Sequence, residues 1–243
     1  VKFDKVAAIP DAEFARGWFT MMELRSRVLD DMSREKNRLI KVIQVRDLRG
    51  LTAGLYGQLV ANPRMVSRLH GVISSSMKGH PESIDKIFLL NVSKTFSGFW
   101  NLVSPIFNDA IRKKFTFLPY PYDPLPVVSA CGVAAIRSMV KGAMDPGWTV
   151  PGTFQVNVPC GDFVEVGVDV PAGKALSWRW SGGDCEFSVL SLPSQTYAVP
   201  AERVAEHEGR CEMGGDADGY VVLRWSMMHS WVTARDLEIT ISS

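Results

Sequence analysis

The chain of 243 residues has a formal net charge of +1, and 46% of its residues are hydrophobic and 22% charged. This composition is that of an ordinary globular protein, and the length fits one large domain or two medium ones. The near-neutral charge argues against nucleic acid as the main partner, and no apolar run approaches the roughly 20 residues that span a bilayer.

Two further features concern the cellular compartment. The opening residues lack a basic region followed by a long apolar stretch, so we expect no signal peptide. No CxxC pair is present among the four cysteines, which favours reduced intracellular thiols over a disulfide framework. These cysteines are Cys131, Cys160, Cys185 and Cys211.

The first half of the chain alternates between helical and strand patterns. Apolar residues at helical spacing predict helices, and short apolar runs bounded by turn residues predict strands. In chain order the elements are a helix at 11–32, a strand at 39–45, a helix at 63–77, a strand at 87–90, a helix at 96–107 and a strand at 115–118. This alternation predicts an α/β layer with mainly parallel strands.

The stretch from residue 79 to residue 115 is the centre of this half. Its strand is a continuous apolar run, Ile87 to Leu90, which suits a sheet covered on both faces. The helix predicted over 96–107 carries apolar residues on nearly every side. Such a helix is either an ordinary core helix or one that flanks an apolar cavity.

From residue 119 the pattern changes. Pro119, Pro121, Pro124 and Pro126 form an exit that no regular helix is expected to use, and one short helix is possible over 133–144. After residue 151, apolar residues alternate with polar ones in short strands, separated by turns such as Ser181-Gly-Gly-Asp184. This predicts an antiparallel sandwich whose core holds most of its tryptophans (Trp178, Trp180, Trp225 and Trp231). We expect domains at 1–118 and 152–243, joined by a linker.

Catalytic and metal-binding patterns are not recognised. The histidines, His70, His80, His207 and His229, do not have metal-ligand spacing. Residues 214–220 resemble a calcium loop but lack its closing glutamate, so we interpret them as a turn. Asp47 follows a strand, as acids of α/β active sites do, but no base or nucleophile is paired with it, and a turn-fixing role is preferred. We therefore expect no enzymatic activity, no cofactor and no metal.

The basic run Arg112-Lys113-Lys114 has two interpretations. It is either a solvated turn before a strand, or a site where Lys114 meets a phosphate while its neighbours contact anionic lipid.

Five motifs in order make the first half resemble the CRAL-TRIO lipid-binding domain of Sec-fourteen-like lipid-transfer proteins. They are DLRG at 47–50, HPES at 80–83, IFLLN at 87–91, the helix at 96–105 and RKKF at 112–115. The family's preceding helical domain and closing segment are not recognised. Residues 152–243 are similar to the GOLD domain, through VPAGKALSWRW at 170–180, CEFSVLSL at 185–192, GYVVLRW at 219–225 and the ending at 226–241. This order is that of Sec-fourteen-like GOLD proteins and patellins.

The resemblance implies that the protein binds one lipid or other lipophile, and transfers it between membranes or presents it, without catalysis. The ligand class that it favours is a phospholipid or phosphatidylinositol. The resemblance also implies a gate helix at 96–107 and a cytoplasmic protein, peripheral at Golgi or endosomal membranes. The implied headgroup residues are Glu82, Lys114 and Arg112. The implied pocket and gate residues are Gln44, Leu89, Phe96, Phe99, Trp100, Val103 and Ile106.

The sequence departs from the pattern of phosphatidylinositol-binding members at two positions. Ile111 stands where they have a threonine, and Ser83 stands where an arginine often follows the glutamate. An alternative function is therefore a membrane-trafficking adaptor, whose lipid pocket is degenerate and whose GOLD domain binds proteins.

Overall fold

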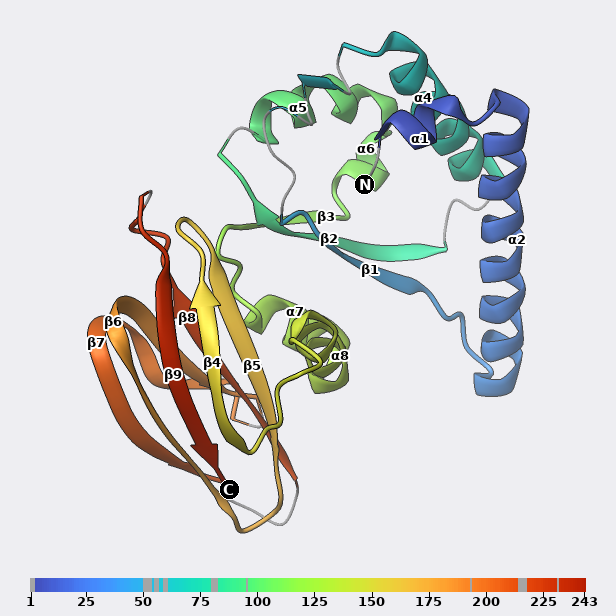
Figure 1. Ribbon diagram of the computed structural model, residues 1–243. Coiled ribbons are helices and arrows are strands. Elements are labelled where there is room, and N and C mark those ends of the chain that lie inside the picture. Colours follow the sequence, from blue (N-terminus) through green and yellow to red (C-terminus); the bar gives the residue numbers. More distant parts are fainter. Residues whose placement is uncertain are drawn as a thin grey trace. The chain divides into compact units, whose positions relative to one another are not determined.

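The computed structural model describes residues 3–49, 54, 57–58, 61–79, 83–94, 96–192, 194–213, 218–230 and 232–243 (Figure 1). The chain divides into two compact units, Val1–Tyr122 and Asp123–Ser243. Each unit has its own sheet and is described by itself.

The sheet of the first unit is parallel. Its strands are β1 (Val42–Asp47), β2 (Ile84–Val92) and β3 (Phe115–Pro119), paired in the order β1-β2-β3. Both pairings are parallel. The prediction of a parallel sheet from alternating helices and strands is therefore confirmed.

The helices of the first unit include two that were not predicted, at Phe3–Ala8 and Asp109–Arg112, and the others differ from the predicted ones mainly at their ends. They are α1 (Phe3–Ala8), α2 (Asp11–Lys36), α4 (Pro63–Gly79), α5 (Phe96–Val103), the 3₁₀ turn η1 (Ser104–Ile106) and α6 (Asp109–Arg112). The single helix predicted over 96–107 is thus an α-helix followed by a 3₁₀ turn. The cause is Pro105, which lacks the N–H that a continuing α-helix needs.

The register of the three strands places side chains on two faces. Leu89 pairs with Arg46 on one side and with Phe117 on the other, and Ile87 pairs in the same way with Gln44 and Phe115. Because side chains alternate along a strand, these residues share one face of the sheet and Phe88 and Leu90 point to the other. Residues 87–90 are all buried, as the continuous apolar run predicted. Figure 1 shows α4, α5 and α6 together on one side of the sheet.

The second unit begins with two helices, α7 (Leu125–Cys131) and α8 (Val133–Ala143). The short helix predicted over 133–144 is α8. The prediction that the prolines exclude a regular helix was wrong for α7. Pro126 lies in its first turn, where the missing N–H has no helical partner to lose.

Six strands follow in one antiparallel sheet. They are β4 (Gly152–Val158), β5 (Phe163–Val170), β6 (Ala175–Ser191), β7 (Thr196–Glu212), β8 (Gly219–Ser226) and β9 (Arg235–Ser242). Their order is β4-β9-β6-β8-β5, and β7 pairs with β6. The antiparallel prediction is confirmed, but these strands form one continuous curled sheet in place of two separate ones.

Strand β6 is the reason that the sheet is continuous. Its first part pairs with β9 and its second part with β8, and the register shifts between Ser181 and Cys185. The turn predicted at 181–184 is therefore an irregularity inside one long strand. Gly182 makes it possible, because its φ of 137° disfavours other residues and an added Cβ would lie 2.3 Å from the carbonyl oxygen of Asp236.

The curled sheet has a large apolar core. It holds Trp178, Trp180 and Trp225, as predicted, with Phe187 and many aliphatic residues. Trp231 and residues 214–217 of the turn predicted at 214–220 lie outside the described residues, and Gly219 and Tyr220 begin β8. The four cysteines are free thiols.

Candidate functional site

Six aromatic side chains gather between α5 and the parallel sheet, and we name them the aromatic cluster. They are Phe96, Phe99, Trp100, Phe107, Phe115 and Phe117. The Trp100 ring centroid lies 4.8 Å from that of Phe115 and 4.9 Å from that of Phe117. Phe96 is buried, but Phe117 keeps 38% of its surface exposed. The cluster is therefore only partly closed.

Local sequence explains how α5 forms its side of the cluster. Phe96, Phe99 and Trp100 are three and four residues apart, so they share one face of the helix. The positions on the opposite side, Ser97 and Asn101, are exposed and polar. The helix is thus amphipathic, which corrects the expectation of apolar residues on nearly every side.

The structure brings four of the predicted pocket residues together: Leu89 and the three aromatic residues of α5 form one apolar cluster with Ile87. Val103 is half-buried at the end of α5, and Ile106 is in η1, where its side chain lies outside the description. Gln44 shares the sheet face, and its Oε1 accepts a hydrogen bond from Arg46 Nη2 at 2.9 Å.

Sequence reasoning missed Phe107, Phe115 and Phe117. The alternation of Phe115, Thr116 and Phe117 in a predicted strand was a usable signal, because it places both phenyl rings on one face of the sheet.

The predicted headgroup residues are not gathered in one place. Lys114 is half-buried, and its ammonium donates to the carbonyl oxygen of Ile84 at the start of β2. Arg112 is exposed and pairs with Asp109 inside α6. Ile111 is buried. Glu82 lies outside the described residues.

Two arginines from distant parts of the sequence are neighbours on this unit, Arg25 of α2 and Arg46 of β1. Arg25 Nη2 donates to Ser83 Oγ at 3.0 Å. Burial first, and then the positive charge of Arg46, lower the pKa of the Arg25 guanidinium. Desolvation also lowers the pKa of Arg46, although part of that residue reaches solvent. No motif joins these residues, so sequence reasoning did not find them.

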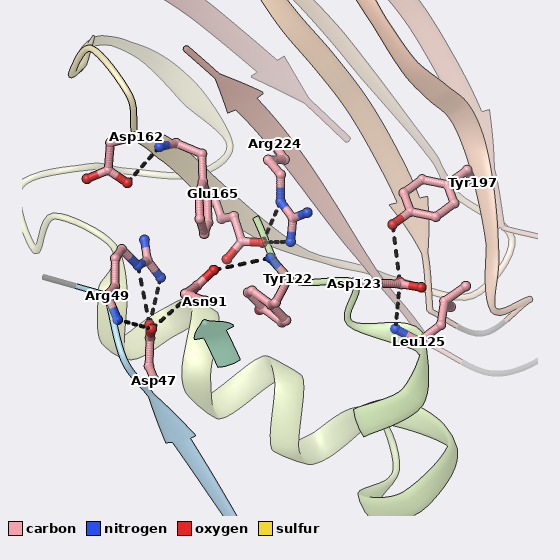
Figure 2. A network of polar contacts seen from close by, with 11 residues as sticks. Asp47, Arg49, Asn91, Tyr122, Asp123, Leu125, Asp162, Glu165, Tyr197 and Arg224 are labelled. Carbon is pink, nitrogen blue, oxygen red and sulfur yellow. Dashed lines mark hydrogen bonds and ion pairs between the residues drawn. The ribbon is translucent and has the colours of Figure 1, made fainter. Parts of the chain in front are cut away.

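A polar network closes the carboxyl edge of the parallel sheet (Figure 2). Asp47 Oδ1 accepts from the backbone N–H of Arg49 at 2.8 Å and from Asn91 Nδ2 at 2.7 Å. Asn91 Oδ1 in turn accepts from the backbone N–H of Tyr122 at 3.1 Å. The turn-fixing role preferred for Asp47 is confirmed.

Within the described ranges, no group of three or more histidine, cysteine or acidic side chains is placed to hold a metal ion. None of the described helices combines the length and apolar character that crossing a membrane requires.

Comparison with known proteins identifies the first unit. Residues 11–123 match the family model of the CRAL/TRIO domain, and this range contains α2, the parallel sheet and the aromatic cluster. The chain therefore contains a CRAL/TRIO domain, which implies the binding or transfer of a lipophile in general.

Other comparisons add little. No curated protein is significantly similar to the chain. A de novo designed double-stranded β-helix is 16% identical over 37% of this chain and 97% of its own, with a TM-score of 0.24. The secreted serine protease VesC from Vibrio cholerae is 14% identical over 53% of this chain and 28% of its own, with a TM-score of 0.31. The pre-peptidase C-terminal domain of a Bacillus anthracis collagenase is 11% identical over 37% and 87%, with a TM-score of 0.26. These scores are too low to indicate a shared fold.

Proposed function

We propose that the chain binds one lipid or other lipophile at the aromatic cluster and transfers it between membranes or presents it, without catalysis. The observation that carries the proposal is a partly exposed set of aromatic rings on the sheet of a CRAL/TRIO domain. Each Å² of apolar surface that an acyl chain covers contributes about 25 cal/mol, so the exposed part of Phe117 favours such a ligand.

The segment 96–107 is the proposed gate. α5 is eight residues long, and an isolated helix of this length is marginal in water. Its position therefore depends on the packing of Phe96 and Trp100 against the sheet. An acyl chain can take over these contacts when the helix moves away, and the exposed aromatic face can then meet a bilayer.

A headgroup would lie at the amino edge of the sheet in this proposal. Lys114 supplies one positive charge there, and Arg112 and Glu82 are the other residues that the family resemblance implies. Binding of a phosphate exchanges the contact between the Lys114 ammonium and the Ile84 carbonyl for a charge-assisted one. Phospholipid or phosphatidylinositol is the ligand class proposed, at Golgi or endosomal membranes.

A second candidate function is a membrane-trafficking adaptor with a degenerate pocket and a GOLD-type second unit that binds proteins. Two observations favour it. The α5 rings lie directly on the sheet, where a ligand would otherwise lie. In addition, β7 pairs only with β6 among the described strands, which leaves an edge for strand addition.

Native mass spectrometry of the full chain after exposure to phospholipid vesicles, with a transfer assay between vesicles, tests the first function. We expect a lipid adduct and transfer, both reduced about ten-fold or more by Phe117→Asp, because a carboxylate on an apolar surface opposes acyl binding. Val232→Asp is the control, since Val232 is 88% exposed in the second unit. Recovery of wild-type chain without lipid or transfer would contradict the proposal. A protein partner retained by residues 152–243 and by Phe117→Asp would favour the adaptor.

A further inference from the structure

Arg25 and Arg46 differ in their partners from Arg68 and Arg224, two arginines that pair with carboxylates away from solvent. Arg68 is buried and pairs with Asp11, and its remaining N–H groups donate to backbone carbonyls. Arg224 is partly buried and pairs with Glu165. Within the part of the chain that the structure describes, Arg25 and Arg46 contact only neutral oxygens, those of Ser83 and Gln44.

The environment of these two side chains is unfavourable for positive charge. The Nε atom of Arg25 is buried and has no hydrogen-bond partner among the described residues. A buried donor without a partner, beside a second positive charge, costs free energy unless an acceptor arrives. Both guanidinium groups stay charged at neutral pH, so they cannot relieve the repulsion by losing a proton.

Arg46 also lies on the face of the sheet that carries the aromatic cluster. Arg46 pairs with Leu89, and Leu89 pairs with Phe117, so Arg46 shares its face with the aromatic cluster. β1 and β3 are two strand spacings apart, about 10 Å. This separation is shorter than an extended acyl chain, and one amphiphile can therefore reach from the aromatic cluster to the arginines.

We propose that Arg25 and Arg46 together bind an oxyanion, the phosphate or carboxylate of an amphiphile whose apolar part occupies the aromatic cluster. This inference rests on the proposed lipophile binding. An oxyanion supplies acceptors for the Arg25 Nε–H and for the outer N–H groups of both guanidiniums, and arginine suits such planar, bidentate contacts. The exposed side of Arg46 gives the anion a route from solvent.

The test uses the full chain with two probes that share one acyl chain, oleoyl lysophosphatidic acid and monooleoylglycerol. We expect the wild type to bind the phosphate-bearing probe about ten-fold more tightly, since charge-assisted hydrogen bonds are the strong ones. Arg25→Gln and Arg46→Gln each lower this preference several-fold and leave affinity for monooleoylglycerol unchanged. Arg27→Gln, an exposed arginine of the same helix, keeps the preference.

Thermal unfolding without ligand separates binding from folding. Removing one of two repelling charges leaves the melting temperature of Arg46→Gln at or above that of the wild type, so a lost preference reports the anion contact. If both variants keep the preference, or lose no more than Arg27→Gln, the inference is wrong. The inference is also wrong if the wild type binds both probes equally. In that case the proposed binding of a lipophile is still supported. If the wild type binds inorganic phosphate through these arginines but neither lipid, the oxyanion site stands and the proposed function fails.

Discussion

The two units treat their large apolar side chains differently. The second unit buries Trp180, Phe187 and Trp225 in one core. Among the described residues of the first unit, Ile87, Leu89 and Phe96 form a small buried cluster, and several large apolar residues are exposed, among them Leu24 at 58% and Phe117 at 38%. An apolar surface that a fold leaves open marks a place of binding more often than a defect. Large apolar side chains are therefore enclosed in the core of the second unit, while several described ones of the first unit keep contact with solvent.

The largest expected effect concerns the closed core of the second unit. Trp225→Ala should lower the free energy of unfolding by about 3–5 kcal/mol, because it leaves a cavity at a side chain with 0% exposure. Chemical denaturation followed by circular dichroism measures this loss. Val232→Ala is the control, and its effect should stay within about 0.5 kcal/mol. A loss below 1 kcal/mol for Trp225→Ala would mean that this core is not closed.

The next effect concerns the polar network at the carboxyl edge of the first unit's sheet. Asn91→Ala should cost about 2–3 kcal/mol, because it removes both side-chain hydrogen bonds of a buried residue and leaves the Tyr122 N–H without its acceptor. Asn91→Gly separates two causes. Asn91 has a φ of 56°, which glycine tolerates, so this variant should be about 1 kcal/mol more stable than the alanine variant. Equal denaturation midpoints for the alanine and glycine variants would show that backbone strain at position 91 does not contribute.

A smaller effect concerns the contribution of Lys114 to the binding of an anionic ligand by the first unit. Lys114→Ala should weaken binding of an anionic phospholipid about five-fold more than binding of a neutral lipophile, because an exposed or half-exposed charge contact is worth about 1 kcal/mol. Lys113→Ala is the matched control, since Lys113 is exposed beside it. Equal losses for the two ligands would deny Lys114 a headgroup role.

The smallest expected effect is a dependence of stability on pH. A hydrogen bond from Arg68 holds the pKa of Asp11 below its ordinary value. The contribution of this pair is therefore present above the unfolded pKa of about 4 and is lost as the pH falls through the lower folded pKa. Asp11→Asn should reduce the fall in the melting temperature of the first unit as the pH is lowered from about 5 to about 3, because an amide cannot be protonated in this range. An unchanged fall would show that other carboxylates cause it.

Sequence patterns predicted the main elements of the first unit, because β2 contains a continuous apolar run and helices such as α4 have strong apolar periodicity. The family resemblance pointed to Leu89, Phe96 and Trp100, which the structure brings into one apolar cluster. Patterns within one element cannot show that Arg25 and Arg46 meet, since the two residues belong to different elements and the fold alone places them together.

The second unit shows a different limit. Alternation predicted its antiparallel strands, but the Ser181–Asp184 sequence has the residues of a turn. The backbone freedom of Gly182 serves a bulge equally well, and only the pairing of β6 with both β8 and β9 distinguishes the two. A local motif cannot report pairing with strands that follow far along the chain.

The long strand β6 has a consequence for how the second unit opens. The same backbone segment hydrogen-bonds to β7 along its length, to β9 through its first part and to β8 through its second. Neither half of the sheet can separate without breaking the ladders of the strand that both halves share. Amide protons on β8 and β9 should therefore exchange with solvent at similar, slow rates, as those of one cooperative folding unit do.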